Sequence, residues 1–154
     1  MIGHEADARF IRDWWVEGER MIRSTPDGWR LLGSGCYRTA YLHEDSNVVY
    51  KLDRHKGWSG QSNERENTQL RSKWLLKLPK GWRFPRWNLF LFEGDGVMAM
   101  ERVDTLIMHC EVPEIRERWD GDRYTRLSYM SDLHDENVGV DEKTGELIII
   151  DWGM

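Results

Sequence analysis

The residues best suited to chemistry lie in the last quarter of the sequence. Asp132 and Asn137 stand five positions apart in a polar stretch, and Asp151 directly follows the apolar run 147–150. An acid at the end of such a run is costly unless it binds something, and Mg²⁺ prefers hard oxygen ligands of this kind. For any one of these motifs the alternative is an ordinary turn built by the aspartate.

A second pair of charged residues lies in the first half of the sequence. Lys51 belongs to an apolar strand candidate, where a charge needs a partner or a ligand. Glu66 shares an inward-facing helical row with Leu70, so the helical phase favours Glu66 over Glu64 as the partner of Lys51. The alternative for Lys51 is an ordinary place on an edge strand, and the alternative for Glu66 is a solvated position on the helix surface.

A glycine-rich turn precedes both charges. Gly33, Ser34 and Gly35 lie between two strand candidates, and the missing side chains allow backbone N–H groups to approach phosphates. Taken alone, such a segment is more often a plain hairpin turn.

Hydrophobic periodicity predicts the elements that position these residues. Helices are expected over 5–23 and 61–77, with at most two short helices in 104–130 and a polar loop over 131–139. The expected strands are 29–33, 38–42, 48–52, 87–92, 97–103 and 146–150.

Five features therefore follow one another: a glycine turn, a strand lysine, a helix glutamate, Asp-x-x-x-x-Asn and Asp-Trp-Gly. This order resembles the protein-kinase-like superfamily, including the small-molecule kinases related to aminoglycoside phosphotransferases. The resemblance covers about residues 29–154 and implies an ATP- and Mg²⁺-dependent phosphotransferase whose acceptor the sequence does not name.

The resemblance also implies a role for each matching residue. Asp132 and Lys51 are the implied catalytic residues: Asp132 orients or deprotonates the acceptor hydroxyl, and Lys51 holds the α- and β-phosphates and pairs with Glu66. Asn137 and Asp151 are the implied Mg²⁺ ligands. The implied ATP-binding residues are Gly33, Ser34, Gly35, Arg38, Lys51, Glu66, Glu101 and Val103, with the backbone from Glu101 to Val103 at the adenine edge.

Two departures from the superfamily pattern shape the expectation. Arg38 replaces the third glycine, so the turn covers phosphates less closely or adds a cation to them. The sequence contains no activation segment after Asp151, so we expect a reduced lower lobe without a peptide-docking platform. The predicted fold is a reduced kinase-like α+β domain over 1–154. It has an N-terminal helix and turn (1–28), an N-lobe with a five-stranded antiparallel sheet and helix C (29–103) and a rudimentary lower lobe (104–154).

Composition limits the partners. A formal charge of −5 argues against nucleic acid binding through the bulk field, and the longest apolar run is too short to span a membrane. Two cysteines and an N-terminus without an apolar leader indicate a reducing compartment, so the expected location is the cytoplasm.

A second function remains open from the sequence. The alternative to a kinase is a nucleotide-binding pseudokinase or inhibitory module that acts through a protein partner. The presence of Asp132 favours catalysis, because a pure binding module has no need of it. A protein substrate, a partner chain and a second copy of this chain remain open as partners. Some of Trp14, Trp15, Trp119 and Trp152 are expected to line a patch at such a contact.

Overall fold

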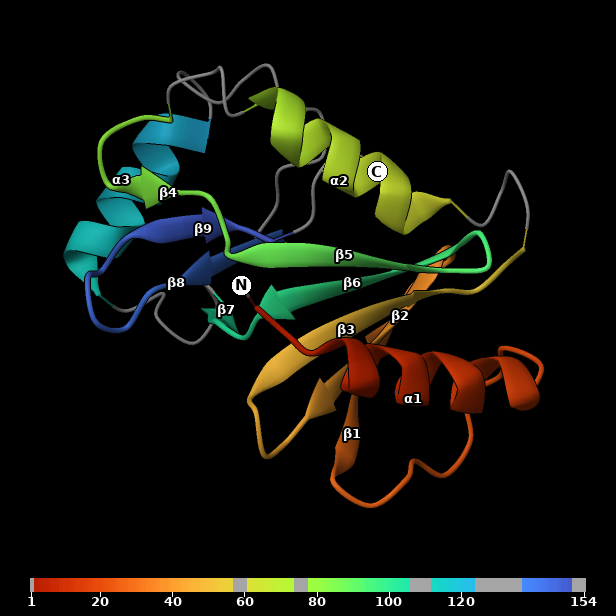
Figure 1. Ribbon diagram of the computed structural model, residues 1–154. Helices are drawn as coiled ribbons and strands as arrows, with labels where there is room; N and C mark the ends of the chain where they lie inside the picture. The colour runs from red at the N-terminus through yellow and green to blue at the C-terminus, as the bar shows by residue number, and fades with distance from the viewer. Residues whose placement is uncertain (1, 57–60, 74–77, 106–111, 124–136, 151–154) are drawn as a thin grey trace. The chain divides into compact units, whose positions relative to one another are not determined.

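The computed structural model describes residues 2–56, 61–73, 78–105, 112–123 and 137–150 (Figure 1). The chain divides into two compact units, residues 1–68 with 86–102 and residues 69–85 with 103–154. The predicted α+β class is confirmed, with three helices and a five-stranded antiparallel sheet in the part that the structure describes. None of the described helices is long and apolar enough to cross a membrane.

The sheet of the first unit is built from local hairpins and one longer connection. Its strands run in the order β1-β2-β3-β6-β5, and every neighbouring pair is antiparallel. The strands are β1 (Trp29–Ser34), β2 (Arg38–His43), β3 (Val48–Asp53), β5 (Trp87–Phe92) and β6 (Asp95–Glu101). Tight turns with positive φ at Asn47, Glu93 and Gly94 close two of the hairpins, so the predicted strands find their partners close by in sequence.

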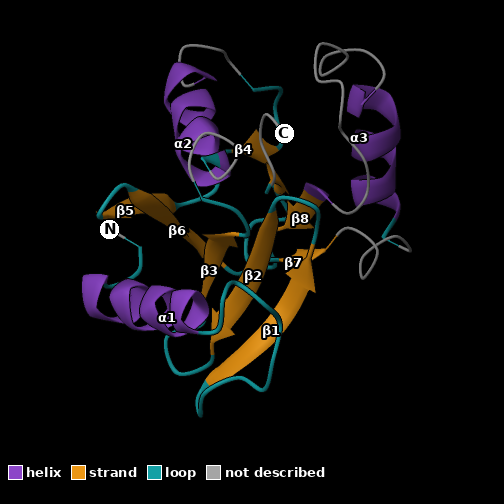
Figure 2. Ribbon diagram, turned by 90° about the vertical axis from the view of Figure 1, so that its right-hand side faces the viewer, coloured by secondary structure: helices purple, strands orange, loops and turns teal. Residues whose placement is uncertain are grey.

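Helix α1 (Glu5–Glu17) covers one face of this sheet (Figure 2). Ala8, Ile11 and Trp15 recur at helical spacing and are fully buried, and they pack against sheet residues that include Tyr41 and Tyr50. The indole N–H of Trp15 finds an acceptor in the Asp53 carbonyl oxygen at 2.9 Å. The apolar stripe of α1 and one set of alternating strand residues therefore form a single core.

The helix predicted over 5–23 ends six residues early. Gly18 caps it by donating its N–H to the Trp14 carbonyl at 3.1 Å, and Glu19 and Arg20 then adopt positive φ. This turn carries the Arg20 guanidinium to Asp95 Oδ2 at 2.9 Å and to the Asp53 carbonyl oxygen at 2.9 Å. Long-range hydrogen bonds thus outweigh the weak helical periodicity beyond Glu17.

Helix α2 (Ser62–Lys73) begins on the opposite face of the sheet from α1 (Figure 1). Asn63 anchors its first turn: the side-chain amide donates to the carbonyl oxygens of Lys51 at 2.7 Å and Gly96 at 2.9 Å. Farther along, Trp87 donates its indole N–H to Asn67 Oδ1 at 3.0 Å. These contacts fix which helical face meets the sheet.

The second unit holds four short strands and one helix among its described residues. The strands are β4 (Trp82–Arg83), β7 (Asp104–Thr105), β8 (Val138–Val140) and β9 (Leu147–Ile149), in the order β4-β9-β8-β7, and the helix is α3 (Pro113–Arg123). The expected polar loop over 131–139 is wrong at its end, because Val138 and Gly139 belong to a buried strand that pairs with β9.

Two of the tryptophans expected at a contact between chains are interior residues. Trp15 is fully buried in the first unit, and Trp119 is buried in the second beside Trp82. The indole N–H of Trp82 donates to Asp122 at 2.7 Å, which satisfies its one polar group. Trp15 and Trp119 are therefore core residues and are not among the tryptophans that could line the expected patch. Trp14 is half-buried against the α1 core, and Trp152 lies outside the described residues.

Candidate functional site

Sheet register decides which residues share a face with Lys51. Ala40, Lys51 and Met98 are direct neighbours across β2, β3 and β6, and side chains alternate between faces along each strand. Tyr41, Tyr50 and Ala99, one position away, belong to the core beneath α1. Lys51 therefore points to the other face of the sheet, where α2 begins.

Lys51 meets Glu66 on this face. Its ammonium group donates to Glu66 Oε1 at 2.9 Å, so the predicted pairing with Glu66 rather than Glu64 is confirmed. The Glu66 side chain has no exposed surface, and the Lys51 side chain is 12% exposed. Burial alone acts to raise the pKa of the Glu66 carboxyl, but the charges of Lys51 and Arg38 outweigh it and hold this pKa well below its usual range.

Arg38 is the second cation on the same carboxylate. Its Nη2 atom donates to Glu66 Oε2 at 2.7 Å, and its Nη1 atom donates to Asn63 Oδ1 at 3.3 Å. The side chain is only 9% exposed. Arg38 thus directs its charge to Glu66, the same carboxylate that Lys51 contacts.

Asp53 lies beside this cluster, opposite Arg38 in the register of β2 and β3. It is 1% exposed, and burial raises its pKa to about 7 even though the Asn63 backbone N–H, Arg38 and Arg20 favour its charged form. Because burial favours its neutral form, Asp53 cancels the nearby cations only in part. Lys51 and Arg38 thus both direct cationic groups at the carboxylate of Glu66 on this face of the sheet.

The glycine turn is closed by hydrogen bonds on either side of its tip. Gly35 donates its N–H to the Arg38 carbonyl at 2.9 Å, and Arg54 donates its guanidinium to the Gly35 carbonyl at 2.8 Å. Within the described residues, no group accepts a hydrogen bond from the N–H of Cys36 or Tyr37 at the tip. A Cβ atom at Gly33 or Gly35 would meet nothing within 4 Å, so the space around both glycines is open.

Apolar side chains continue the face on which Lys51 lies. Leu42, Val49 and Met100 are aligned across β2, β3 and β6, one row from Ala40 and Met98. Leu42 and Met100 are buried, whereas Val49 and Ala40 retain exposed surface. This strip offers an apolar contact area next to the charged cluster.

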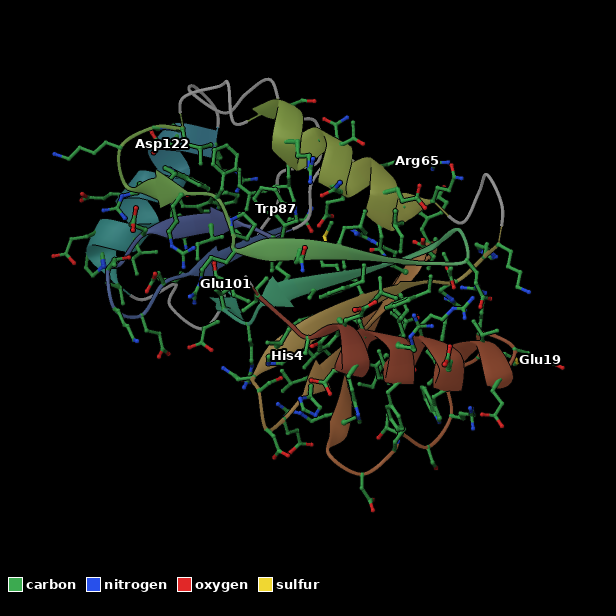
Figure 3. All side chains as sticks on the ribbon, in the orientation of Figure 1. His4, Glu19, Arg65, Trp87, Glu101 and Asp122 are labelled. Carbon is green, nitrogen blue, oxygen red and sulfur yellow. The ribbon has the colours of Figure 1, made fainter. Side chains whose placement is uncertain are left out.

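Glu101, labelled in Figure 3, ends β6 and is hydrogen-bonded to Arg86. Its carboxylate accepts from the Arg86 backbone N–H at 2.9 Å and from the Arg86 guanidinium at 3.2 Å. Its own N–H donates to the Arg86 carbonyl at 3.0 Å. Val103 belongs to the second unit, where its side chain packs so closely on Gly139 that a Cβ there would collide with it. Within the predicted adenine edge, Glu101 is therefore held by hydrogen bonds to Arg86, whereas Val103 has a packing role.

Asn137 lies at the start of the β8–β9 hairpin in the second unit. It is 7% exposed, and its carbonyl oxygen accepts from the Ile150 N–H at 2.8 Å. The hairpin thus places Asn137 beside the residue that precedes Asp151 in the sequence. Asp151 and Asp132 lie outside the described residues. Among the described residues no three His, Cys, Asp or Glu side chains gather as a metal-binding group.

Sequence reasoning did not anticipate Asn63 and Asp53 as parts of the charged cluster. Asn63 joins α2 to β3 and β6 and also accepts from Arg38, while its N–H donates to Asp53 Oδ1 at 3.3 Å. One signal was present: an asparagine near the start of a predicted helix commonly bonds to backbone groups. Asp53 directly follows the predicted strand 48–52, and nothing in the sequence indicated that it would join the charged cluster.

Comparison with protein-family models and with curated proteins finds no match to this chain.

Proposed function

We propose that this protein binds Mg²⁺-ATP and transfers its γ-phosphoryl group to an acceptor hydroxyl. The observation that carries the proposal is the buried ion pair between Lys51 and Glu66, with Nζ to Oε1 at 2.9 Å. A buried ion pair is a poor device for stability alone, because desolvation offsets most of its attraction. Its presence beside an open glycine turn supports the interpretation that the lysine is held ready for phosphate.

The proposed nucleotide contacts use two kinds of surface in the first unit. The Lys51 ammonium group provides attraction for phosphate oxygens, as do the N–H groups of Cys36 and Tyr37, for which no acceptor lies among the described residues. The half-buried surfaces of Val49 and Ala40 provide an apolar platform for a planar base.

The proposed transfer step assigns the remaining residues. Asn137 and Asp151 supply oxygen ligands for Mg²⁺, whose charge neutralises the phosphate oxygens during transfer. The acceptor oxygen forms a bond to the γ-phosphorus while the bond to the β–γ bridging oxygen breaks. Asp132 takes the proton of the acceptor hydroxyl, and ADP leaves.

The decisive experiment is transfer of labelled γ-phosphate from ATP by the purified protein to water, to itself and to candidate acceptors. Lys51→Met is expected to weaken ATP binding and transfer together. Arg30→Met is the matched control, because Arg30 is an exposed cation on β1, the edge strand of the same sheet. Equal activity in all three proteins contradicts the proposed role of Lys51.

Asp132→Asn separates transfer from binding. It keeps the side-chain shape and removes the base, so transfer is expected to fall by about 10²–10⁴ while ATP affinity stays within a few-fold. If the unmodified protein binds ATP but transfers no phosphate, it fits the alternative function, a nucleotide-binding pseudokinase.

A further inference from the structure

The two oxygens of the Glu66 carboxylate have different cationic partners. Oε1 accepts from Lys51 at 2.9 Å, and Oε2 accepts from Arg38 at 2.7 Å. The two cations come from different strands, since Arg38 begins β2 and Lys51 lies within β3. The carboxylate therefore does not depend on Lys51 alone for its charge balance.

This division matters when a phosphate competes for Lys51. A phosphate oxygen that attracts the ammonium group weakens its bond to Glu66, and a buried carboxylate without a cation is strongly destabilising. Arg38 stays on Glu66 in that event, because its guanidinium is also held by Asn63 Oδ1 at 3.3 Å. An arginine fork is suited to this task because it donates in two directions at once.

We propose that Arg38 is a positioning residue that holds Glu66 and the start of α2 in place while Lys51 engages the phosphates of a nucleotide. This inference rests on the proposed function. It assigns Arg38 an action through Glu66 rather than on the phosphates themselves.

The first test needs no nucleotide. Arg38→Met and Lys51→Met each remove one of these two cations from Glu66, whereas the double variant removes both. We expect the melting temperature of the double variant to fall by about 4 °C or more beyond the sum of the two single losses. Additive losses overturn the inference, because they mean that the two cations act independently.

A third substitution covers the case in which the double variant does not fold. Glu66→Gln removes the negative charge that both cations balance. Adding it to the double variant is therefore expected to restore cooperative unfolding. In the Glu66→Gln background the effects of Arg38→Met and Lys51→Met are expected to add. Failure of Glu66→Gln to restore folding contradicts the inference.

The second test measures Mg²⁺-ATP binding by calorimetry. Arg38→Met is expected to weaken affinity by about tenfold or more, a loss equivalent to about 1.4 kcal/mol, because Lys51 must then satisfy Glu66 and phosphate together. Arg38→Lys is expected to recover part of that affinity, and Arg30→Met is expected to change nothing. Unchanged affinity in Arg38→Met overturns the inference.

The two proposals fail in distinguishable ways. If the unmodified protein does not bind Mg²⁺-ATP, the proposed function is wrong and the role of Arg38 in nucleotide binding falls with it. If Mg²⁺-ATP binds but the losses are additive without nucleotide, the role of Arg38 is wrong and the proposed function stands.

Discussion

Asp53 combines a buried carboxyl group with incomplete hydrogen bonding. Its Oδ1 atom accepts from the Asn63 N–H at 3.3 Å, whereas Oδ2 is buried and finds no partner among the described residues. Burial raises the pKa of this carboxyl to about 7 against the opposing effects of the Asn63 N–H, Arg38 and Arg20, and Asp95 raises it further. The folded protein therefore favours the protonated acid.

This raised pKa predicts that Asp53 lowers stability as the pH rises. The unfolded acid ionises near pH 3.8, so its full stabilising contribution is present below that pH and is lost by about pH 7. Between pH 5 and 7.5 the unfolding free energy of the unmodified protein should fall by about 2–3 kcal/mol relative to Asp53→Asn. Urea denaturation of both proteins at several pH values measures the difference, and parallel pH profiles contradict the prediction.

The sequence predicted the pairing of Lys51 with Glu66 because helical phase is a local property. Glu66 lies four residues before Leu70, which is buried, and Glu64 does not share that row. The second partner, Arg38, was not predictable in this way. Its position depends on the register of β2 against β3 and on how α2 meets the sheet, and both are set by contacts distant in sequence.

At the scale of elements, Asn63 is the main polar link between the start of α2 and the sheet. It is fully buried. Its side-chain amide donates hydrogen bonds to the Lys51 carbonyl in β3 and to the Gly96 carbonyl near the start of β6. It also accepts from Arg38. The amide thus fixes the helix at the height that brings Glu66 to Lys51.

Replacing Asn63 with Ala is expected to destabilise the protein by about 2–4 kcal/mol, because two buried carbonyl oxygens and the Arg38 guanidinium lose a partner. Asn67→Ala is the matched control one turn along the helix. It removes one hydrogen bond, to the Trp87 indole, and should cost about 1 kcal/mol. Urea denaturation measures both losses. Equal losses would show that Asn63 acts as an ordinary helix residue.

Element boundaries were predicted best where the signal was local. The five strands of the first unit lie within a few residues of their predicted ranges, because alternating residues and tight turns define them. The end of α1 was missed because Arg20 leaves the helix for Asp95 and Asp53, which are far away in sequence. The short strands β4 and β7 each have two residues, too few for any periodicity.

At the scale of the whole molecule, the residues that the proposed function uses are divided between the two compact units. Lys51, Glu66 and Arg38 belong to the first unit. Asn137 belongs to the second unit and is far from these three residues in the sequence. No local pattern in the sequence predicts how such residues combine, so the order of motifs was the only guide to a common function.

Nucleotide binding should appear in the melting temperature, because a ligand that binds only the folded state stabilises it. A ligand at about 100 times its Kd adds about 2.7 kcal/mol to the unfolding free energy, which corresponds to a rise of about 5–10 °C at this chain length. We expect this rise with Mg²⁺-ATP and a clearly smaller one with ATP and EDTA, because the metal neutralises phosphate charge that the protein must otherwise meet alone.

Asn137→Ala distinguishes the metal contribution from the phosphate contribution. Loss of its amide oxygen is expected to reduce the Mg²⁺-dependent part of the shift and to leave the shift with ATP and EDTA unchanged. Lys51→Met should instead reduce both shifts, since its ammonium is proposed to meet the phosphates with or without metal. Arg30→Met should reduce neither. Equal shifts of the unmodified protein with and without Mg²⁺ would mean that nucleotide binds without the proposed metal ligands, and Asn137 would then have only its structural role at the start of the β8–β9 hairpin.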